Sequence, residues 1–238
     1  MPAKQSKRYR EALKVIGAES GKKPRPLADA IALLKKFPKT KFNETVNLAF
    51  SLGVDAKQSD QMVRGTAALP HGSGKKVRVV VFARGAAADA AKAAGVEHVG
   101  FEDMIKKVQD GWTDFDVAIA TSEAMGEVRK LGRVLGPKGL MPNPKTGTVT
   151  DDVGKAVKEF QAGRVEFKLD KAANVHVICG KISFTEDALY QNARAVIEGV
   201  LAAKPATAKG TYIQTCTISS TMSLGLRVDT ASLVTQQS

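Results

Sequence analysis

The chain has 238 residues, a net charge of +12 and a hydrophobic fraction of 43%. No stretch approaches the roughly 20 apolar residues that a membrane-spanning helix needs, and the basic residues 1–10 do not lead into the apolar run of a secretory signal. These features exclude membrane and secreted classes and leave room for one large domain or two modest ones. We expect a cytoplasmic protein with no membrane partner.

The N-terminal part of the chain predicts two helices and a strand. Residues 6–16 and 26–37 are expected to be helical, the second beginning near Pro26 with apolar residues along one face. Residues 42–52 then alternate between apolar and polar side chains. That period of two is typical of a half-buried strand in an antiparallel sheet.

The middle of the chain alternates apolar runs with helix-forming runs. Strands are expected at 77–82, 96–99 and 115–120, and helices at 86–94 and 101–110. Ser122 is placed to cap the next helix, and Asp151 with Asp152 to cap a later one. The alternation predicts a parallel sheet with helices on its faces.

The C-terminal part returns to the first pattern. Residues 164–169 and 175–179 are expected to form a pair of strands, and 185–203 a long helix with acids in its first turn. Two final strands follow at 211–220 and 224–228, and residues 233–238 are expected to be frayed.

The economical fold class is an α+β terminal domain, an antiparallel sheet with helices, interrupted by an inserted three-layer α/β domain of Rossmann-like type. We expect the terminal domain to comprise residues 1–69 and 160–238, and the inserted domain residues 70–159. The pattern also allows three consecutive units.

The residues of known catalytic and metal sites do not occur in their usual spacing. Gly85 stands alone where a dinucleotide-binding turn needs three glycines. The HGSGK segment at 71–75 precedes a strand, whereas a phosphate loop follows one, so a hairpin or hinge is favoured. We expect Cys179 and Cys216 to be buried free thiols. The chain is therefore expected not to be an enzyme and to hold no metal and no cofactor.

Charge gives the first positive indication of function. Residues 1–41 hold twelve lysines and arginines against three acids, and residues 129–145 hold five against none. Basic patches bind phosphate backbones and release counterions. Nucleic acid is favoured over an anionic membrane, because the basic runs are interleaved with glycine and proline and form no amphipathic basic helix that ends in aromatic residues.

The segment LGRVLGPKGLMPNP at 131–144 is expected to be a structured loop without helix or strand, because glycine and proline are frequent in it. Its apolar residues indicate packing against its own domain, with Arg133 and Lys138 projecting. An RNA contact and a solvated connection are equally consistent with those two charges.

Two strand segments carry side chains that suit RNA. Lys41, Phe42 and Thr45 begin one strand and could form an RNA surface. The residues alone favour Phe42 as a core residue and Lys41 as a solvated edge residue. In residues 215–221, every second residue carries a hydroxyl on one face, which suits ribose and phosphate contacts. An ordinary exposed strand favours threonine as well.

Seven segments, in order along nearly the whole chain, resemble bacterial members of the large-subunit ribosomal protein one family. They are KRYREAL at 7–13, TKFNETV at 40–46, SDQMVRGTAALPHGSGK at 59–75, DGWTDFD at 110–116, LGRVLGPKGLMPNPKTGTV at 131–149, AGRVEFKLDK at 162–171 and KGTYIQTCTISSTM at 209–222. The 131–149 segment is the most specific of them.

The resemblance implies a second domain inserted into the first, and a monomer when free. It implies a structural protein of the large ribosomal subunit that binds the mobile 23S rRNA stalk near the E site, assists release of deacylated tRNA, and represses its own operon mRNA. The implied rRNA and mRNA contacts are Lys41, Phe42, Thr45, Asp170, Thr215, Thr221, Met222 and Ser223. Arg133 and Lys138 are expected to form a secondary contact with RNA or with the E-site tRNA. At Ser223 and Leu224 the chain departs from the family's glycine and proline.

Two other classes of protein remain as alternatives. A nucleotide-binding enzyme built on the middle α/β domain is suggested only by its alternation of strands and helices. A general DNA-binding protein is the other.

Overall fold

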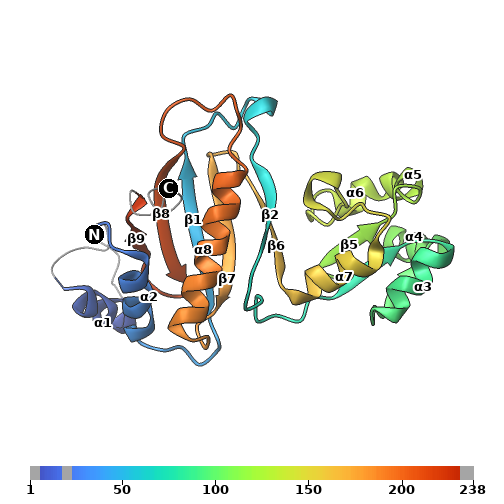
Figure 1. The fold of residues 1–238 in the computed structure, drawn as a ribbon. Coiled ribbons are helices and arrows are strands. Elements are labelled where there is room, and N and C mark those ends of the chain that lie inside the picture. Colours follow the sequence, from blue (N-terminus) through green and yellow to red (C-terminus); the bar gives the residue numbers. More distant parts are fainter. Residues whose placement is uncertain (1–5, 18–22, 231–238) are drawn as a thin grey trace. The chain divides into compact units, whose positions relative to one another are not determined.

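A computed structural model describes residues 6–17 and 23–230 (Figure 1). The expected frayed end, 233–238, lies outside the described residues. Contacts divide the chain into two compact units. We name them the terminal unit, up to Gly74 and from Val165 onward, and the middle unit, Lys75–Arg164. Both junctions lie a few residues later than the expected ones, because residues 71–74 hydrogen-bond and pack within the terminal unit.

The terminal unit is built on a four-stranded antiparallel sheet of order β7-β1-β8-β9. Its elements are α1 (Lys7–Ile16), α2 (Leu27–Lys36), β1 (Thr45–Leu52), η1 (Ser59–Gln61), β2 (Arg64–Ala68), β6 (Arg164–Lys168, which begins at the junction), β7 (Asn174–Lys181), α8 (Glu186–Ala202), β8 (Ile213–Ser220) and β9 (Leu226–Val228). Every second side chain of β1 is buried, which confirms the strand that the alternation predicted.

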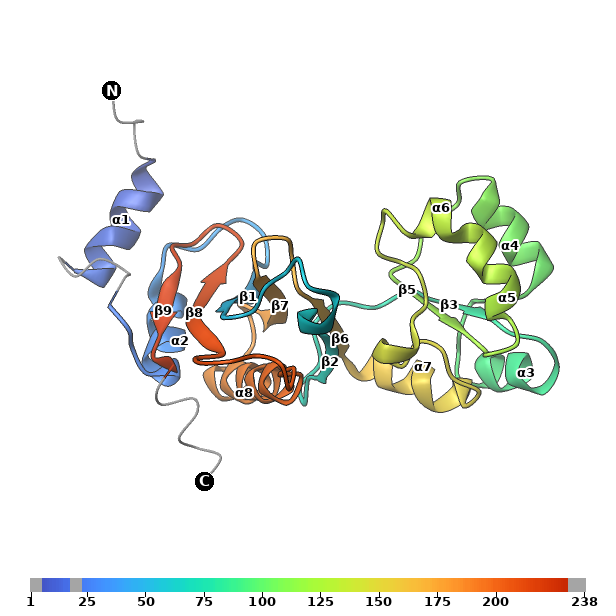
Figure 2. The same ribbon diagram turned by 90° about the horizontal axis from the view of Figure 1, so that it is seen from above.

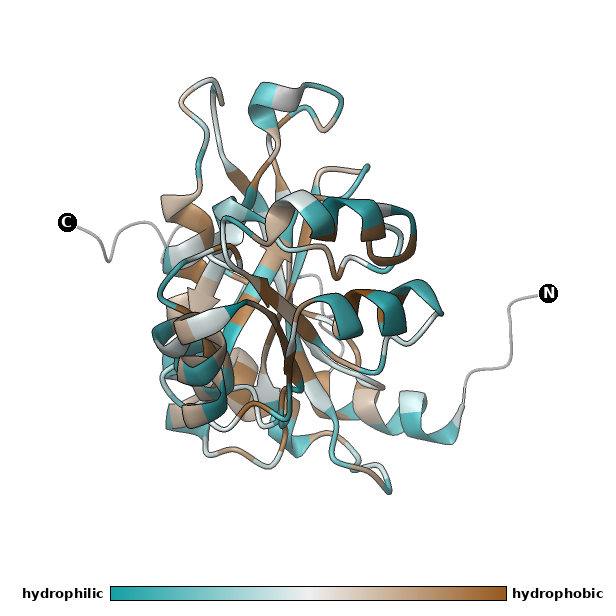
Figure 3. Cartoon of the chain, turned by 90° about the vertical axis from the view of Figure 1, so that its right-hand side faces the viewer, coloured by the Kyte–Doolittle hydropathy of each residue, from teal (hydrophilic) through white to brown (hydrophobic). Residues whose placement is uncertain are grey.

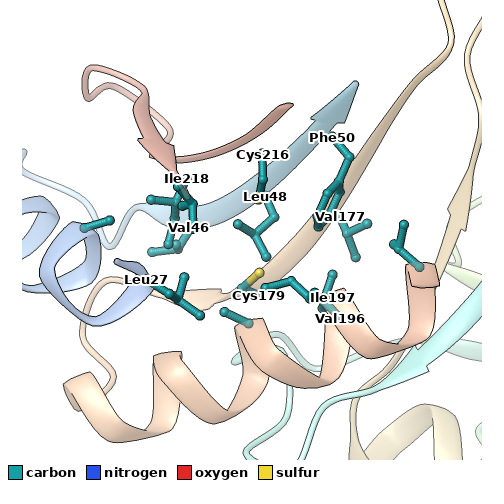
Figure 4. Packing of buried hydrophobic residues seen from close by; sticks show 14 of the residues in the cluster. Leu27, Val46, Leu48, Phe50, Val177, Cys179, Val196, Ile197, Cys216 and Ile218 are labelled. Atoms are coloured by element: carbon teal, nitrogen blue, oxygen red, sulfur yellow. The ribbon is translucent and has the colours of Figure 1, made fainter. Parts of the chain in front are cut away.

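Helices α2 and α8 contribute to the core on one face of this sheet, and Figure 2 shows α8 along that face. In Figure 4, inward side chains of β1 and β8 meet Val196 and Ile197 of α8. Thr185 caps α8 by accepting a hydrogen bond from the Ala188 N–H at 3.2 Å, and the acids of the first turn follow it. The long helix predicted at 185–203 is thus confirmed.

One predicted strand pairing is wrong. β6 pairs with β2, and β7 pairs with β1, so that only the Leu169–Val175 bridge joins the segments expected to be partners. Two contacts favour the observed β2–β6 pair. Arg64 donates from Nε to Glu166 at 2.8 Å, and Gly65 leaves room for the Phe167 ring, which would lie 2.9 Å from a Cβ there.

Asn192 of α8 is a buried side chain that anchors the connection leading to the middle unit. Its Oδ1 accepts from the His71 N–H at 3.0 Å. Its Nδ2 donates to the carbonyls of Gly72 and Cys179, at 3.0 and 2.8 Å. One amide therefore satisfies three backbone groups from two segments, 71–72 and Cys179, that lie far apart in sequence.

The middle unit holds a parallel three-stranded sheet of order β4-β3-β5 between two layers of helices. Its elements are β3 (Val79–Phe82), α3 (Gly85–Ala93), β4 (His98–Gly100), α4 (Glu102–Gln109), β5 (Val117–Ala120), α5 (Met125–Val128), η2 (Arg129–Leu131), α6 (Gly132–Leu135), η3 (Pro144–Thr146) and α7 (Val153–Ala162). Two separate cores lie on the two faces of β3. Val80 and Phe82 face α4 and α6, whereas Val79 and Val81 face α3 and α7. Figure 3 shows these strands as apolar.

Two local predictions in the middle unit are corrected. The hydroxyl that accepts the Ala124 N–H before α5 belongs to Thr121, at 3.3 Å, and not to Ser122. The segment 131–144 is not devoid of helix, since residues 132–135 form the single turn of α6. Leu131 and Leu135, four residues apart, are both buried and fix that turn. Asp152 caps α7 as expected, accepting from the Lys155 N–H at 3.2 Å.

Candidate nucleic-acid interface

The face of the four-stranded sheet opposite α8 carries outward-pointing polar side chains. They are Thr45, Asn47 and Ser51 of β1, Thr215, Thr217 and Ser219 of β8, and Asn174 and His176 of β7. The strand register aligns them in rows across the sheet. Asn47 lies between Ile178 and Ser219, and Ser51 between Asn174 and Thr215. We call these residues the polar sheet face. The alternation predicted from residues 215–221 is confirmed.

One end of the polar sheet face is the Thr45–Thr221 junction. The Thr221 Oγ1 accepts from the Thr45 N–H at 3.1 Å, and the Thr221 N–H donates to the Thr45 carbonyl at 3.1 Å. Lys181 of β7 donates from Nζ to the Thr45 Oγ1 at 2.7 Å. The structure therefore brings together Thr45 and Thr221, two predicted contact residues, and adds a cation that was not predicted.

A buried carboxylate lies beneath this end. Glu44 is 6% exposed, accepts a hydrogen bond from the Ser220 hydroxyl, and accepts the Met222 N–H at 3.2 Å. Burial alone would raise the pKa of Glu44, but hydrogen bonds from Ser220, Thr40 and Met222 and the charge of Arg8 together lower it. Glu44 is thus held as an anion that fixes the turn after β8.

Glu44 is a residue of this candidate interface that the sequence interpretation missed. Glu44 stands just before β1, two residues from Val46 and four from Leu48. Its side chain is therefore expected on the same face as theirs, which points into the core. A charged residue at an inward position is rarely buried unless it is paired. That departure from the apolar pattern was the signal available in the sequence.

Ser223 closes the turn that carries Met222. Its Oγ accepts from the Ser220 N–H at 2.8 Å and donates to the Leu224 carbonyl at 3.0 Å. Among the described residues other than glycine, only Ala173 has a positive φ, so Ser223 does not occupy the conformation that favours glycine. The departure from the family's glycine is therefore accommodated by side-chain hydrogen bonds.

Replacing Ser223 with glycine, the family's residue, is expected to destabilise the protein by about 1 kcal/mol, because a hydrogen bond is lost and the unfolded chain gains freedom. Ser223→Ala, which loses only the hydroxyl, should account for most of this difference. Chemical denaturation of both variants checks the expectation. A glycine variant more stable than the wild type would contradict it.

Lys41 and Phe42 lie on the connection that leads into β1, and both are exposed. The Phe42 side chain is 53% exposed, so the interpretation as a core residue is wrong. Phe42 and Met222, which is 56% exposed, line one pocket together with Ser223. An aromatic ring, a thioether and hydroxyls thus gather at the Thr45–Thr221 end.

Asp170 and Thr215 lie at the other end of the polar sheet face. Thr215 pairs with Ser51, six residues along β1 from Thr45, which is about 20 Å at the usual rise of a strand. Asp170 accepts the N–H groups of Asn174 and Ala172 at 2.7 and 2.8 Å, and these bonds lower its pKa. The predicted residues therefore mark two ends of one face rather than a single cluster.

Arg133 and Lys138 belong to the middle unit. Both are exposed, and Lys138 Nζ contacts the hydroxyl of Thr113. The neighbouring Leu131 and Leu135 are buried, which confirms that the segment packs against its own unit.

The described residues give no support to catalysis. Burial raises the pKa of Cys216 to about 12 and also raises that of Cys179, so both free thiols stay protonated at neutral pH. Arg84, the residue before α3, lies over the Phe101 ring and pairs with Glu102 at 2.9 Å. Within the described ranges, no group of three or more potential metal ligands occurs, and no helix is long and apolar enough to span a membrane.

The chain was compared with known protein families. The family described as "Ribosomal protein L1p/L10e family" matches residues 34–224, which include both ends of the polar sheet face and the whole middle unit.

Proposed function

Because the chain belongs to the ribosomal protein L1p/L10e family, we propose that it binds the mobile stalk of 23S rRNA near the E site through the polar sheet face. Members of this family are structural ribosomal proteins that bind rRNA, and the chain is one of them. The stalk as the target, and the residues that contact it, are the proposal.

The observation that carries the proposal is the composition of the polar sheet face. Hydroxyl and amide side chains occur on all three strands, interspersed with Ala49, His176 and Ile178. Lys181 and Phe42 lie at one end. Duplex RNA hides its major groove and displays 2′-hydroxyls across a wide, shallow minor groove. A flat face rich in donors and acceptors suits such a surface, and the chain's net charge of +12 supports attraction to it.

Finer roles are also part of the proposal. We propose that the chain is a bacterial member of the family, that it assists release of deacylated tRNA from the E site, and that Arg133 and Lys138 provide a secondary tRNA contact. We also propose that the polar sheet face represses translation by binding the chain's own operon mRNA. We further propose that the middle domain is an inserted domain of Rossmann-like type, and that the free protein is a monomer.

Filter binding to the stalk rRNA fragment at physiological salt tests the function. We expect tight binding to the RNA stem-loop and much weaker binding to the same sequence made as DNA, because DNA lacks the 2′-hydroxyl. Equal affinity for the stalk fragment and an unrelated RNA duplex would refute the proposal.

Phe42→Ala and Thr221→Val are expected to weaken stalk binding about tenfold each, since base stacking and a lost hydrogen bond to ribose or phosphate have effects of this order. Binding to unrelated duplex RNA should change little, because neither side chain is charged. Met62→Ala and Thr211→Val alter exposed residues outside the polar sheet face and serve as matched controls. Equal losses on both RNAs would remove Phe42 and Thr221 from the interface.

A further inference from the structure

A pocket of about 300 Å³ lies beside the polar sheet face in the terminal unit. It is lined by residues from the start of α1, by the segment 34–44 that runs from the end of α2 toward β1, by Ile182, and by the turn 220–224. α1 is tied to the turn by Arg8, whose Nη2 donates to the Met222 carbonyl at 2.8 Å. The pocket therefore depends on a helix that none of the predicted contacts includes.

The wall of the pocket is held in place before any ligand binds. Ser220 and Met222 both donate hydrogen bonds to the buried Glu44 carboxylate. Thr40 in turn donates to the Phe42 carbonyl at 2.8 Å, which shapes the connection opposite the turn. A preformed pocket loses less freedom when a ligand binds.

Exposed apolar side chains concentrate at this pocket. Six large hydrophobic residues of the described chain are exposed, and three of them, Tyr9, Phe42 and Met222, line it, with 40%, 53% and 56% of their surfaces accessible. Two are aromatic rings and one is a polarisable thioether. Such side chains stack on flat unsaturated rings.

The charges around the pocket favour an anion. Arg8, Lys35 and Lys39 line it, whereas the only acid in the lining is Glu44, whose charge is engaged by its donors. Cations next to exposed rings are the combination that binds a single unpaired nucleotide, with the base on the rings and the phosphate near the cations.

We propose that this pocket binds one unstacked nucleotide of the bound RNA, with its base against Tyr9, Phe42 and Met222 and its phosphate near Arg8 and Lys39. The inference rests on the proposed RNA-binding function and adds α1 to the interface. Recognition then combines the duplex on the polar sheet face with one flipped base beside it.

Tyr9→Ala tests the pocket, with Val15→Ala as the matched control on the same helix, since Val15 is 38% exposed and does not line the pocket. We expect Tyr9→Ala to weaken stalk RNA binding about tenfold and Val15→Ala less than twofold. Because tyrosine is uncharged, the dependence of affinity on salt should stay as in the wild type. If wild-type binding is tight and the two variants bind equally, the pocket proposal is wrong while the proposed function stands.

Methyl NMR of the methionines tests the stacking of a base directly, because it reports contact at Met222 and does not depend on a substitution that could disturb the fold. A stacked base should shift the Met222 methyl signal in the complex, whereas the exposed Met62 of the same unit serves as the internal reference. In a second measurement, adenosine monophosphate is added to the free protein at millimolar concentration, and the Met222 methyl signal is followed again. A Met222 shift with the free nucleotide and none with RNA would assign the pocket to a mononucleotide, and a shift with neither would overturn nucleotide binding.

Discussion

Replacing Asn192 with leucine is expected to lower the free energy of unfolding of the terminal unit by about 3 kcal/mol or more. The leucine side chain has a similar size, but it leaves the His71 N–H and the carbonyls of Gly72 and Cys179 without their partner. Each buried backbone group left unpaired costs about 1–3 kcal/mol. For a protein of this size, such a loss corresponds to a fall of roughly 10 °C in Tm.

The chain offers separate reporters for its two units. Both cysteines are buried in the terminal unit, and the single tryptophan, Trp112, belongs to the middle unit. The rate of thiol labelling therefore measures opening of the terminal unit, while Trp112 fluorescence follows the other. We expect Asn192→Leu to accelerate labelling strongly and to shift the fluorescence transition less.

Gln191→Leu is the matched control for Asn192→Leu. Gln191 precedes Asn192 on α8, is exposed, and shares a hydrogen bond of 2.6 Å with the His71 ring. Because solvent replaces that bond, the loss should stay below about 1 kcal/mol. Equal destabilisation by the two substitutions would show that the amide of Asn192 does not anchor the connection.

Local periodicity predicted the strands and helices well, because it depends on neighbouring residues alone. The alternation through Val46, Leu48 and Phe50 placed β1, and the acids after Thr185 placed the start of α8. The strand partner of β6 was predicted wrongly because pairing depends on residues that are distant in sequence. The β2–β6 pair depends on Arg64 and Glu166, and no local pattern links residues so far apart in sequence.

The candidate site was predicted as residue types but not as an arrangement. The residues alone favoured a core position for Phe42, and only its position on the connection before β1 decides its exposure. Asp170 and Thr215 were grouped with Thr45, although the register places them at the other end of the sheet. The pocket was not predicted at all, because several segments that lie far apart in sequence must fold together to form it.

Replacing Glu44 with leucine is expected to have the largest effect on RNA binding. Ser220 and the Met222 N–H lose their acceptor, so the turn that presents Thr221 and Met222 is no longer fixed. Hydrogen bonds to a charged group contribute about 1.5–3 kcal/mol each. We expect stalk affinity to fall more than tenfold, with smaller loss on unrelated duplex RNA, when both are measured by filter binding on protein that remains folded by circular dichroism.

Glu44→Gln removes the charge of Glu44 while keeping its shape. The pH dependence of stability then shows whether that charge stabilises the native state. Since folding lowers the pKa of Glu44, its charge stabilises the native state above the unfolded pKa, near 4.5, and this contribution disappears as the pH falls through the folded pKa. Wild type should therefore be more stable than Glu44→Gln at pH 7, and the difference should shrink below about pH 4.5. Denaturation curves of the two proteins at pH 7 and pH 3.5 measure it. A difference that stays constant or grows toward acid pH would mean that the Glu44 carboxylate is not held as an anion beneath the turn.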